Sequence, residues 1–508
     1  MTNAITKSLD SASIASATAI SMKQQNENNS AQFRPEKIVC IGQVQTGKKV
    51  DFNKPFLASG NADDIGTICG FGSPLHRMAL KLYPKSLNGS KVDTYFLPIE
   101  APKTADAEVK TLTITATGVT KSFSGYIKFK DMPFEAAADI AGKVATAYQL
   151  NPAQAPRKTD LNAYETTLIP FSLLKGMSAS EVAQAIFDVL IEETGLPFIP
   201  TIEENVLTLS AKWAGQDSKF DIEIVDAQNN IIASETYGVT FEITTTTEAA
   251  GVGEISDEAL ATLDEEFGVT RVVCQYSTTE VLNQLQEKFD AFHDPLIAQF
   301  VICYTSIEAP EHETVKGTYD KEKLIATGTA RRDDYINVQI VGDYGNLRKL
   351  NYGERNQLLK AGYSNLVKKS DGSYRLEDLV TFYHPVGKQN PLFRFDRDVT
   401  VIANCAYSLM SKFRDSEEWK SVILIAEEDL TNNPAARKLS DVKAAVNTQI
   451  GLLGKAGLIA NYKNAQKRTT LEIDATNPNR VNINPRWEIT GVARIFDLVN
   501  FVGFYFGG

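Results

Sequence analysis

The order of hydrophobic and polar positions divides the chain into segments of different character. Residues 1–34 are mostly Ser, Ala, Asn, Thr and Gln, and Ile14 and Ile20 give at most a weak strand. This composition buries too little apolar surface to offset the entropy cost of ordering. It therefore predicts an extended N-terminal arm. The apolar run "KIVCIGQV" at 37–44 follows and predicts a buried strand.

The next segments predict a helix and then a region rich in strands. In "DDIGTICGFGSPLHRMALKLYPKS", Ser73 is the expected N-cap and Pro74 the first helical residue. From 105 to 248, alternating threonine-rich stretches such as "VKTLTITATGV" and "YGVTFEITTTT" are typical of half-buried strands. One helix, "SASEVAQAIFDVLIEETG", interrupts them, and Gly195 is expected to end it. We interpret 105–248 as a β-rich inserted domain.

Helices and strands alternate between 249 and 345. A helix at 256–267 precedes the strand "TRVVCQY", and Ser277 with Glu280 is the expected capping box of the next helix. The strands "AQFVICYT" and "INVQIVG" follow, separated by the helix "YDKEKLIATG". This alternation implies a parallel sheet covered by helices on both faces. With 35–104, the region forms a discontinuous α/β core domain.

The last third predicts a mixed α+β C-terminal domain over 346–496. "NYGERNQLLKAG" is an expected helix ended by Gly362, and the following hairpin is expected to turn at Asp371-Gly372. Two long helices are expected at 396–414 and 440–455. The strands "TTLEID" and "RVNIN" come after them.

The closing segment, "FDLVNFVGFYFGG", predicts an apolar strand and forms a C-terminal arm over 497–508. Only Asn500 is polar on the face that carries Phe496, Leu498, Val502, Phe504 and Phe506. Such a strand belongs inside a sheet, and an unpaired edge is a template to which other chains add. The residues alone leave two possibilities open, which are burial in the chain's own sheet and addition to the sheet of another subunit.

Composition narrows the class of protein. A length of 508 residues corresponds to about three domains of ~150 residues. The net charge of −11, with no lysine- or arginine-rich block, argues against a nucleic-acid partner. We expect no membrane insertion, because no apolar run is long enough to span a bilayer, and Asp10 interrupts what would be the core of a signal peptide. Five scattered cysteines without metal or redox spacing fit a reducing cytoplasm.

Candidate chemistry is sparse. Gly42, Gly47 and Lys48 have the spacing of a phosphate-binding loop and follow a predicted strand. However, Lys49 stands where Ser or Thr would hold magnesium, and no helical period follows. The four histidines are scattered, and no nucleophile motif occurs. We predict no catalytic, cofactor-binding or metal site, and a nucleotide-dependent enzyme that uses Gly42–Lys48 is the alternative.

Several blocks resemble the sheath proteins of contractile tails, with the sheaths of Mu-like phages the nearest group. In order these are "KIVCIGQV", "DDIGTICGFGSPLHRMA", "GERNQLLKAGYSNLVKKSDGSYRLEDLVTFY" and "NPNRVNI" before an apolar C-terminus. The most specific block, 351–383, carries Leu358-Leu359 and Gly362. It departs from the family pattern at Asp378, where a basic residue is common, and at Phe382, where a second threonine is common.

The resemblance implies a structural polymer and no enzyme. Sheath proteins of this family share a core with subtilisin-like topology that lacks its catalytic residues. They stack as six-subunit rings around a tail tube, between baseplate and tail terminator proteins, and contract to drive the tube through the target envelope. Their terminal arms add strands to the sheets of neighbours, which favours donation of 497–508. The resemblance also implies assembly in the cytoplasm of a bacterial host and a final place in the virion tail.

The resemblance further suggests which helix contacts the tube. The candidate is "LSDVKAAVNTQIGLLGKAG", with Asp441, Lys443 and Lys455 facing outward. An ordinary core helix is the alternative interpretation of this segment. A non-contractile surface or adhesion protein built on 105–248 is a third hypothesis for the whole chain.

Overall fold

A computed structural model describes most of the chain. The described residues are 33–83, 92–130, 134–135, 165–166, 168–293, 299–305, 339–340, 350–368, 374–381 and 392–491. Contacts divide the chain into two compact units, a central unit (Pro35–Ala403) and a terminal unit (Met1–Arg34 with Asn404–Gly508). The two units are described separately below.

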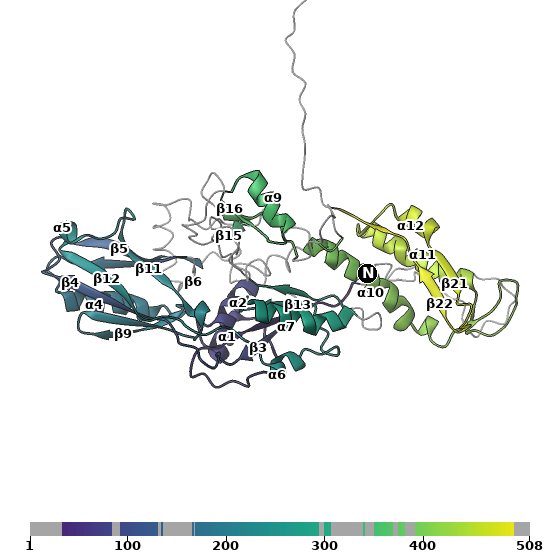
Figure 1. Cartoon of the computed structure of the whole chain (residues 1–508), viewed down its shortest axis with the longest axis horizontal. Helices are drawn as coiled ribbons and strands as arrows, with labels where there is room; N and C mark the ends of the chain where they lie inside the picture. Colours follow the sequence, from purple (N-terminus) through teal and green to yellow (C-terminus); the bar gives the residue numbers. More distant parts are fainter. Residues whose placement is uncertain are drawn as a thin grey trace, which may run out of the picture. The chain divides into compact units, whose positions relative to one another are not determined.

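A five-stranded sheet lies in the middle of the central unit (Figure 1). Its strand order is β14-β13-β1-β3-β2, in which only the edge strand β2 is antiparallel to its neighbour. Six successive residues of β1, from Ile38 to Gln43, are buried, as expected for a strand inside a parallel sheet. The strands are β1 (Lys37–Gln43), β2 (Phe56–Leu57), β3 (Asp93–Ile99), β13 (Arg271–Cys274) and β14 (Ile302–Tyr304).

Helices cover both faces of this sheet. On one face, α1 (Ala62–Cys69) and α2 (Pro74–Leu82) pack against a row that includes Ile38, Cys40 and Phe96. On the other face, α6 (Asp257–Ala261) and α7 (Thr279–Asp290) pack against Val39, Ile41 and Leu97. Alternate residues of β1 therefore supply two separate hydrophobic cores. The mixed α/β class is confirmed, as are the Ser73 N-cap and Pro74 at the start of α2.

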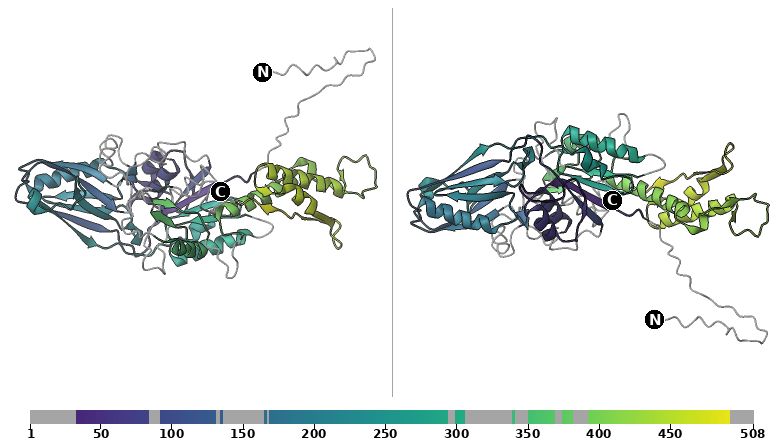
Figure 2. Two further views of the ribbon diagram at one scale, coloured as in Figure 1. Left: turned by 90° about the horizontal axis from the view of Figure 1, so that it is seen from above. Right: turned by 90° about the horizontal axis from the view of Figure 1, so that it is seen from below.

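The described part of the inserted region forms two larger antiparallel sheets, the short pair β6 (Phe134–Glu135) and β7 (Glu165–Thr166), and the helices α4 and α5. Figure 2 shows the two larger sheets and α4 gathered in one lobe. The larger sheet has the order β12-β4-β10-β9, and the smaller has the order β11-β5-β8. Residues from both sheets and from α4 share one hydrophobic core. The elements are β4 (Val109–Ala116), β5 (Phe123–Lys130), β8 (Leu168–Leu173), α4 (Ala179–Glu192), β9 (Phe198–Glu203), β10 (Val206–Ala211), β11 (Asp221–Asp226), α5 (Ser234–Tyr237) and β12 (Val239–Thr247).

The two ends of the inserted region meet. The backbone N–H of Asp106 donates to the carbonyl of Ala250 at 2.9 Å, and the N–H of Ala250 donates back to Asp106 at 3.1 Å. The chain therefore leaves the parallel sheet after β3 and returns to it before β13 through adjacent points.

A helix and a small sheet complete the central unit. In α9 (Tyr352–Lys360), Asn351 and Glu354 form a capping box, and Gly362, with φ of 90°, ends the helix as predicted. The antiparallel hairpin of β16 (Leu366–Lys368) and β17 (Tyr374–Leu376) is confirmed, although its Asp371-Gly372 turn lies outside the described residues.

The terminal unit is mixed α and β, and it shares one helix with the central unit. Helix α10 (Asp396–Arg414) crosses the boundary between Ala403 and Asn404. Helix α11 (Leu439–Lys455) buries Val442, Val446 and Ile450, and both long helices match the prediction. The other elements are β18 (Ile423–Leu424), β19 (Ala436–Arg437), β20 (Ile459–Ala460), α12 (Tyr462–Arg468), β21 (Thr470–Ile473), β22 (Val481–Asn484) and β23 (Glu488–Ile489). Strand β21 pairs antiparallel with β22, and β20 with β23.

Two helix boundaries differ from the prediction. The helix expected at 256–267 ends at Ala261, because the Thr262 hydroxyl donates back to the carbonyl of Ala259 at 2.6 Å and Asp264 caps the N–H of Phe267. The Ser277–Glu280 capping box is also wrong. Thr278 is the N-cap of α7, and its hydroxyl accepts from the N–H of Val281.

Two further expectations fail for identifiable reasons. Gly195 does not end α4. The C-cap of this helix is Glu193, whose backbone N–H donates to the carbonyl oxygen of Leu190. The segment "INVQIVG" does not join the parallel sheet, since β15 (Gln339–Ile340) pairs antiparallel with β17. Its apolar residues alternate with polar ones, which is the pattern of an antiparallel strand rather than a buried parallel one.

Some expectations fall outside the described residues. These are the helix at 319–328, the weak strand with Ile14 and Ile20, and the apolar tail with Phe496, Leu498, Val502, Phe504 and Phe506. The domain boundary expected at 346 also differs from the division by contacts, which keeps 350–403 in the central unit.

Gly72→Ala should destabilise the protein much more than Gly47→Ala, although both glycines have positive φ (80° and 84°). A Cβ at Gly72 would lie 2.1 Å from the carbonyl oxygen of Leu196, whereas one at Gly47 meets open space. We expect a loss of about 1–2 kcal/mol for Gly47→Ala from backbone strain alone, and on the order of 3 kcal/mol or more for Gly72→Ala. Urea denaturation measures both losses. Equal losses would contradict the close approach of the inserted domain to the turn before α2.

Candidate functional site

The topology of the parallel sheet identifies where a ligand would be expected. In open α/β sheets, ligands bind beyond the carboxyl ends of two adjacent strands whose connections leave in opposite directions. After β1, the next parallel strand in sequence is β3, which lies beside β1 toward one edge of the sheet. After β13, the next is β14, which lies beside β13 toward the opposite edge. The expected position is therefore beyond Gln43 and Cys274, between β1 and β13.

The residues at this position bind one another. The backbone N–H of Gln43 donates to Oε1 of Gln275 at 2.6 Å, and Nε2 of Gln43 donates to the hydroxyl of Tyr276 at 2.7 Å. All three side chains belong to buried residues. Burial raises the pKa of Tyr276, and the nearby charge of Asp217 raises it further, so the phenol stays neutral.

The inserted domain completes this network. Nε2 of Gln43 also donates to the carbonyl oxygen of Ala214 at 2.6 Å, and Nε2 of Gln275 donates to the carboxylate of Asp217. Residues 214–217 thus occupy the place where an α/β enzyme would hold its ligand. Local sequence patterns did not predict this cluster. The signal present in the sequence was a glutamine at the carboxyl end of each of the apolar strands β1 and β13.

Lys212 lies in the same loop and ties it to the central sheet. Its Nζ donates to the carbonyl oxygens of Phe71 and Thr194 at 2.7 and 2.8 Å, and the N–H of Thr46 donates to the carbonyl of Lys212 at 2.7 Å. Burial lowers the pKa of Lys212 to about 8. The amine acts as a bridge between the inserted domain and the turn before α2.

The phosphate-loop hypothesis is not supported at Gly42–Lys48. The ammonium of Lys48 donates to the carbonyl oxygen of Thr67 at 3.2 Å. The chain continues into the short strand β2 (Phe56–Leu57), so no helix N-terminus follows the loop to receive a phosphate.

Three of the described thiols and His76 lie in buried surroundings. Burial raises the pKa of Cys69 and of Cys405 to about 12 and that of Cys303 still further, so these thiols remain protonated. His76 is buried, and its Nδ1 accepts from the N–H of Gly72 at 2.9 Å. In the part of the chain that the structure describes, no group of His, Cys, Asp or Glu is arranged to hold a metal ion.

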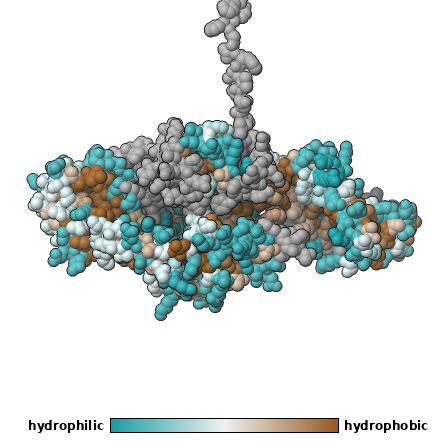
Figure 3. All heavy atoms as spheres, in the orientation of Figure 1, coloured by the Kyte–Doolittle hydropathy of each residue, from teal (hydrophilic) through white to brown (hydrophobic). Residues whose placement is uncertain are grey.

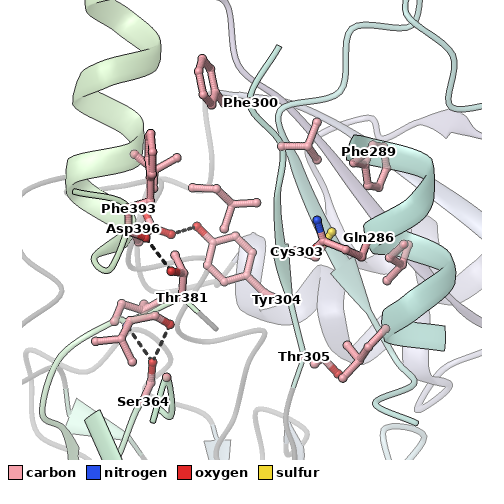
Figure 4. A pocket seen from close by; sticks show the side chains of 18 of the residues that line it. Gln286, Phe289, Phe300, Cys303, Tyr304, Thr305, Ser364, Thr381, Phe393 and Asp396 are labelled. Atoms are coloured by element: carbon pink, nitrogen blue, oxygen red, sulfur yellow. Dashed lines mark hydrogen bonds between the residues drawn. The ribbon is translucent and has the colours of Figure 1, made fainter. Parts of the chain in front are cut away.

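A pocket of about 600 Å³ lies along the outer edge of β14 (Figure 4). Apolar side chains line most of it, including Phe289, Phe300, Val380 and Phe393. Its polar groups are engaged within the protein, since Tyr304 donates to Asp396, the N–H of Val380 donates to Ser364, and Thr381 donates to the carbonyl of Phe393. The pocket therefore offers apolar surface rather than a reactive group.

The expected tube-contact residues are exposed on α11. Asp441, Lys443 and Lys455 are exposed, whereas Val442, Val446, Ile450 and Leu453 of this helix are buried. The Asp441 carboxylate accepts from the N–H of Lys438 at 2.8 Å and so also caps the helix. Whether these residues contact a tube stays a prediction, as does the role of the tail residues.

Large exposed apolar residues on the described surface are mostly isolated. Figure 3 shows hydrophobic residues in small patches among hydrophilic ones on one face, and the most exposed single case is Leu430, at 96%. Scattered residues of this kind are normal on protein surfaces. Within the described ranges, every helix is too short or too polar to cross a bilayer.

Comparison with solved structures gives several alignments, of which two are described here. The sheath tail protein of Desulfitobacterium hafniense aligns over 90% of this chain and 93% of its own, with 12% identity and a TM-score of 0.41. The anti-feeding prophage baseplate aligns over 50% of this chain and 76% of its own, with 11% identity and a TM-score of 0.34. Neither alignment reaches a TM-score of 0.5, so neither carries an argument about function. No protein-family model and no curated protein matches the chain.

Addition of Mg-ATP should leave the melting temperature unchanged. A nucleotide site with a Kd of about 10 μM would stabilise the fold by about 2.7 kcal/mol at 1 mM ligand, which a thermal scan detects easily. A rise in melting temperature that Lys48→Ala abolishes would restore the nucleotide hypothesis.

The stability contributed by Lys212 should rise with pH. Between pH 8 and the usual lysine pKa of 10.5, the unfolded chain binds more protons than the folded protein at this residue. Relative to Lys212→Met, the wild type should therefore gain about 3 kcal/mol of unfolding free energy between pH 7 and pH 10.5. Urea denaturation across this range measures the difference, with Lys443→Met as the exposed control. Parallel pH profiles for wild type and Lys212→Met would contradict the burial of a charged amine.

Proposed function

We propose that this chain is a structural subunit of a contractile tail sheath. In this proposal, subunits stack as six-membered rings around a tail tube and contract to drive the tube through the target envelope. The sheath assignment rests on the sequence resemblance from about residue 35 to the end. The observation that carries a structural rather than enzymatic role is the carboxyl edge of the parallel sheet, where residues 214–217 occupy the ligand position.

The most specific block of the resemblance has clear structural reasons for its residues. Asn351 and Glu354 cap α9, Leu358 is buried at 4% exposure, and Gly362 takes the positive φ that ends the helix. Strands β16 and β17 then follow as a hairpin. Each residue type is thus required by the local fold, which supports carrying the resemblance over at these positions.

The hairpin β21–β22 is our candidate acceptor for a donated strand. Strand β21 is mostly exposed and β22 mostly half-buried, and the two form a separate two-stranded sheet among the described strands. A two-stranded hairpin is marginally stable alone in water, and its outer edges offer unpaired backbone groups for strand addition. The tip is held by Asp474, whose pKa is lowered by hydrogen bonds from Thr476 and its neighbours.

A single donated arm would bind its neighbour reversibly, whereas the many donated arms of an assembled lattice would together bind tightly. Burying five apolar side chains of the tail contributes about 8–15 kcal/mol. Ordering about ten residues costs about 10–20 kcal/mol. A single arm therefore binds marginally, while several linked contacts act at high effective concentration. Free subunits can then stay unassembled until a template gathers them.

The proposed partners follow from the same role. Copies of this chain form the rings, and a tail tube protein lies inside them. The stack of rings lies between baseplate and terminator proteins. The exposed residues Asp441, Lys443 and Lys455 of α11 are the proposed tube contacts. Assembly would take place in the bacterial cytoplasm, and the finished subunit would belong to the virion tail.

Removal of residues 497–508 should leave a folded monomer that no longer polymerises. Negative-stain microscopy of the purified chain should show short tubes for the full chain and none for the truncated one, while circular dichroism stays the same. Phe504→Asp should act like the truncation, because it places a charge on the apolar face of the strand. Asp497→Asn is the matched control and should still form tubes. Loss of folding on truncation would instead place the tail in the subunit's own core.

A further inference from the structure

Both covalent connections between the two units begin next to one buried arginine. The chain passes from the terminal unit to the central unit between Arg34 and Pro35, and returns between Ala403 and Asn404. Glu36 closely follows the first connection, and Asp396 and Thr400 closely precede the second. All three side chains surround Arg271 of β13.

The guanidinium of Arg271 contacts both connections at once. One terminal nitrogen lies 3.3 Å from Oδ2 of Asp396, and the other donates to the hydroxyl of Thr400 at 3.0 Å and lies 3.9 Å from Oε1 of Glu36. Tyr304 of β14 donates a further hydrogen bond to Asp396. The side chains of Arg271, Glu36 and Asp396 are 5%, 4% and 1% exposed.

Burial makes this contact hard to replace. Removing one partner of a buried ion pair leaves an uncompensated charge in a medium of low dielectric. Here the carboxylates of Glu36 and Asp396 both lie against the same guanidinium. Lysine keeps the charge but lacks the planar group that can reach several acceptors at once. Asp396 also begins α10, where the positive end of the helix dipole favours a carboxylate.

The same two connections meet again within the terminal unit. The backbone N–H of Arg34 donates to Oδ1 of Asn404 at 2.9 Å. This bond is between neutral groups and is weaker than the charge-assisted contacts of Arg271. The two connections thus contact a buried ionic cluster in one unit, and the Arg34–Asn404 hydrogen bond joins them in the other.

We propose that Arg271 is a clamp that couples the two connections, so that the root of the N-terminal arm and the start of α10 are fixed to the central unit together. The alternative is an ordinary core ion pair, which would stabilise the fold without coupling the two connections.

Hydrogen exchange in the unassembled full chain distinguishes these roles. In Arg271→Lys, amides of both 33–40 and 396–404 should exchange about tenfold faster or more, while β10 and α11 keep their wild-type rates. Arg355→Lys, which alters the pair of Arg355 with Glu377 at 3.5 Å in the same unit, should change neither connection. Faster exchange at one connection only, or equal acceleration throughout the chain, would overturn the proposal.

Single-sided variants keep the test informative if Arg271→Lys does not fold. Glu36→Gln should accelerate exchange mainly in 33–40, Thr400→Val mainly in 396–404, and the double variant should exceed the sum of the two effects. Additive effects would overturn the coupling. Because the measurement needs neither tube nor polymer, its failure would leave the proposed sheath function standing.

Discussion

Gln43 and Gln275, which follow the two central strands of the parallel sheet, direct their hydrogen bonds to each other and to the inserted domain. The same loop of the inserted domain holds Lys212, whose amine binds the turn before α2. Buried polar groups need hydrogen-bond partners, and here those partners are other groups of the same chain. The carboxyl edge of the sheet is thereby the place where the inserted domain joins the parallel sheet, which agrees with the structural role proposed above.

The remaining features of the described residues agree with the structural role proposed above. Protonated thiols, an engaged His76 and an apolar pocket along β14 give the described part of the chain little reactive chemistry. The terminal unit presents exposed residues on α11 and the separate hairpin β21–β22. In the sheath role proposed above, these surfaces would contact other chains.

The sequence predicted those elements whose signals are local and strong. The unbroken apolar run of β1, the Ser73-Pro74 start of α2 and the Gly362 end of α9 all appear as expected. Errors arose where neighbouring residues compete for one role, as Ser277 and Thr278 do for the N-cap of α7, or where sheet membership depends on distant partners, as at β15. The network of Gln43, Gln275 and Ala214 joins three distant segments, and local pattern carries no information about such a meeting. The tail residues and the tube contacts remain predictions.

The bridge between Asp106 and Ala250 has a consequence for how the chain folds. Neighbouring strands β1 and β13 are linked by a bond between Lys37 and Thr270, 233 residues apart in sequence. Closing so long a loop is entropically costly and slow when the intervening chain is disordered. Once the inserted domain has formed, its ends already lie together, and the loop that remains to be closed between Lys37 and Thr270 is less than half as long. Early formation of the inserted domain therefore lowers the entropy cost of bringing β13 back beside β1.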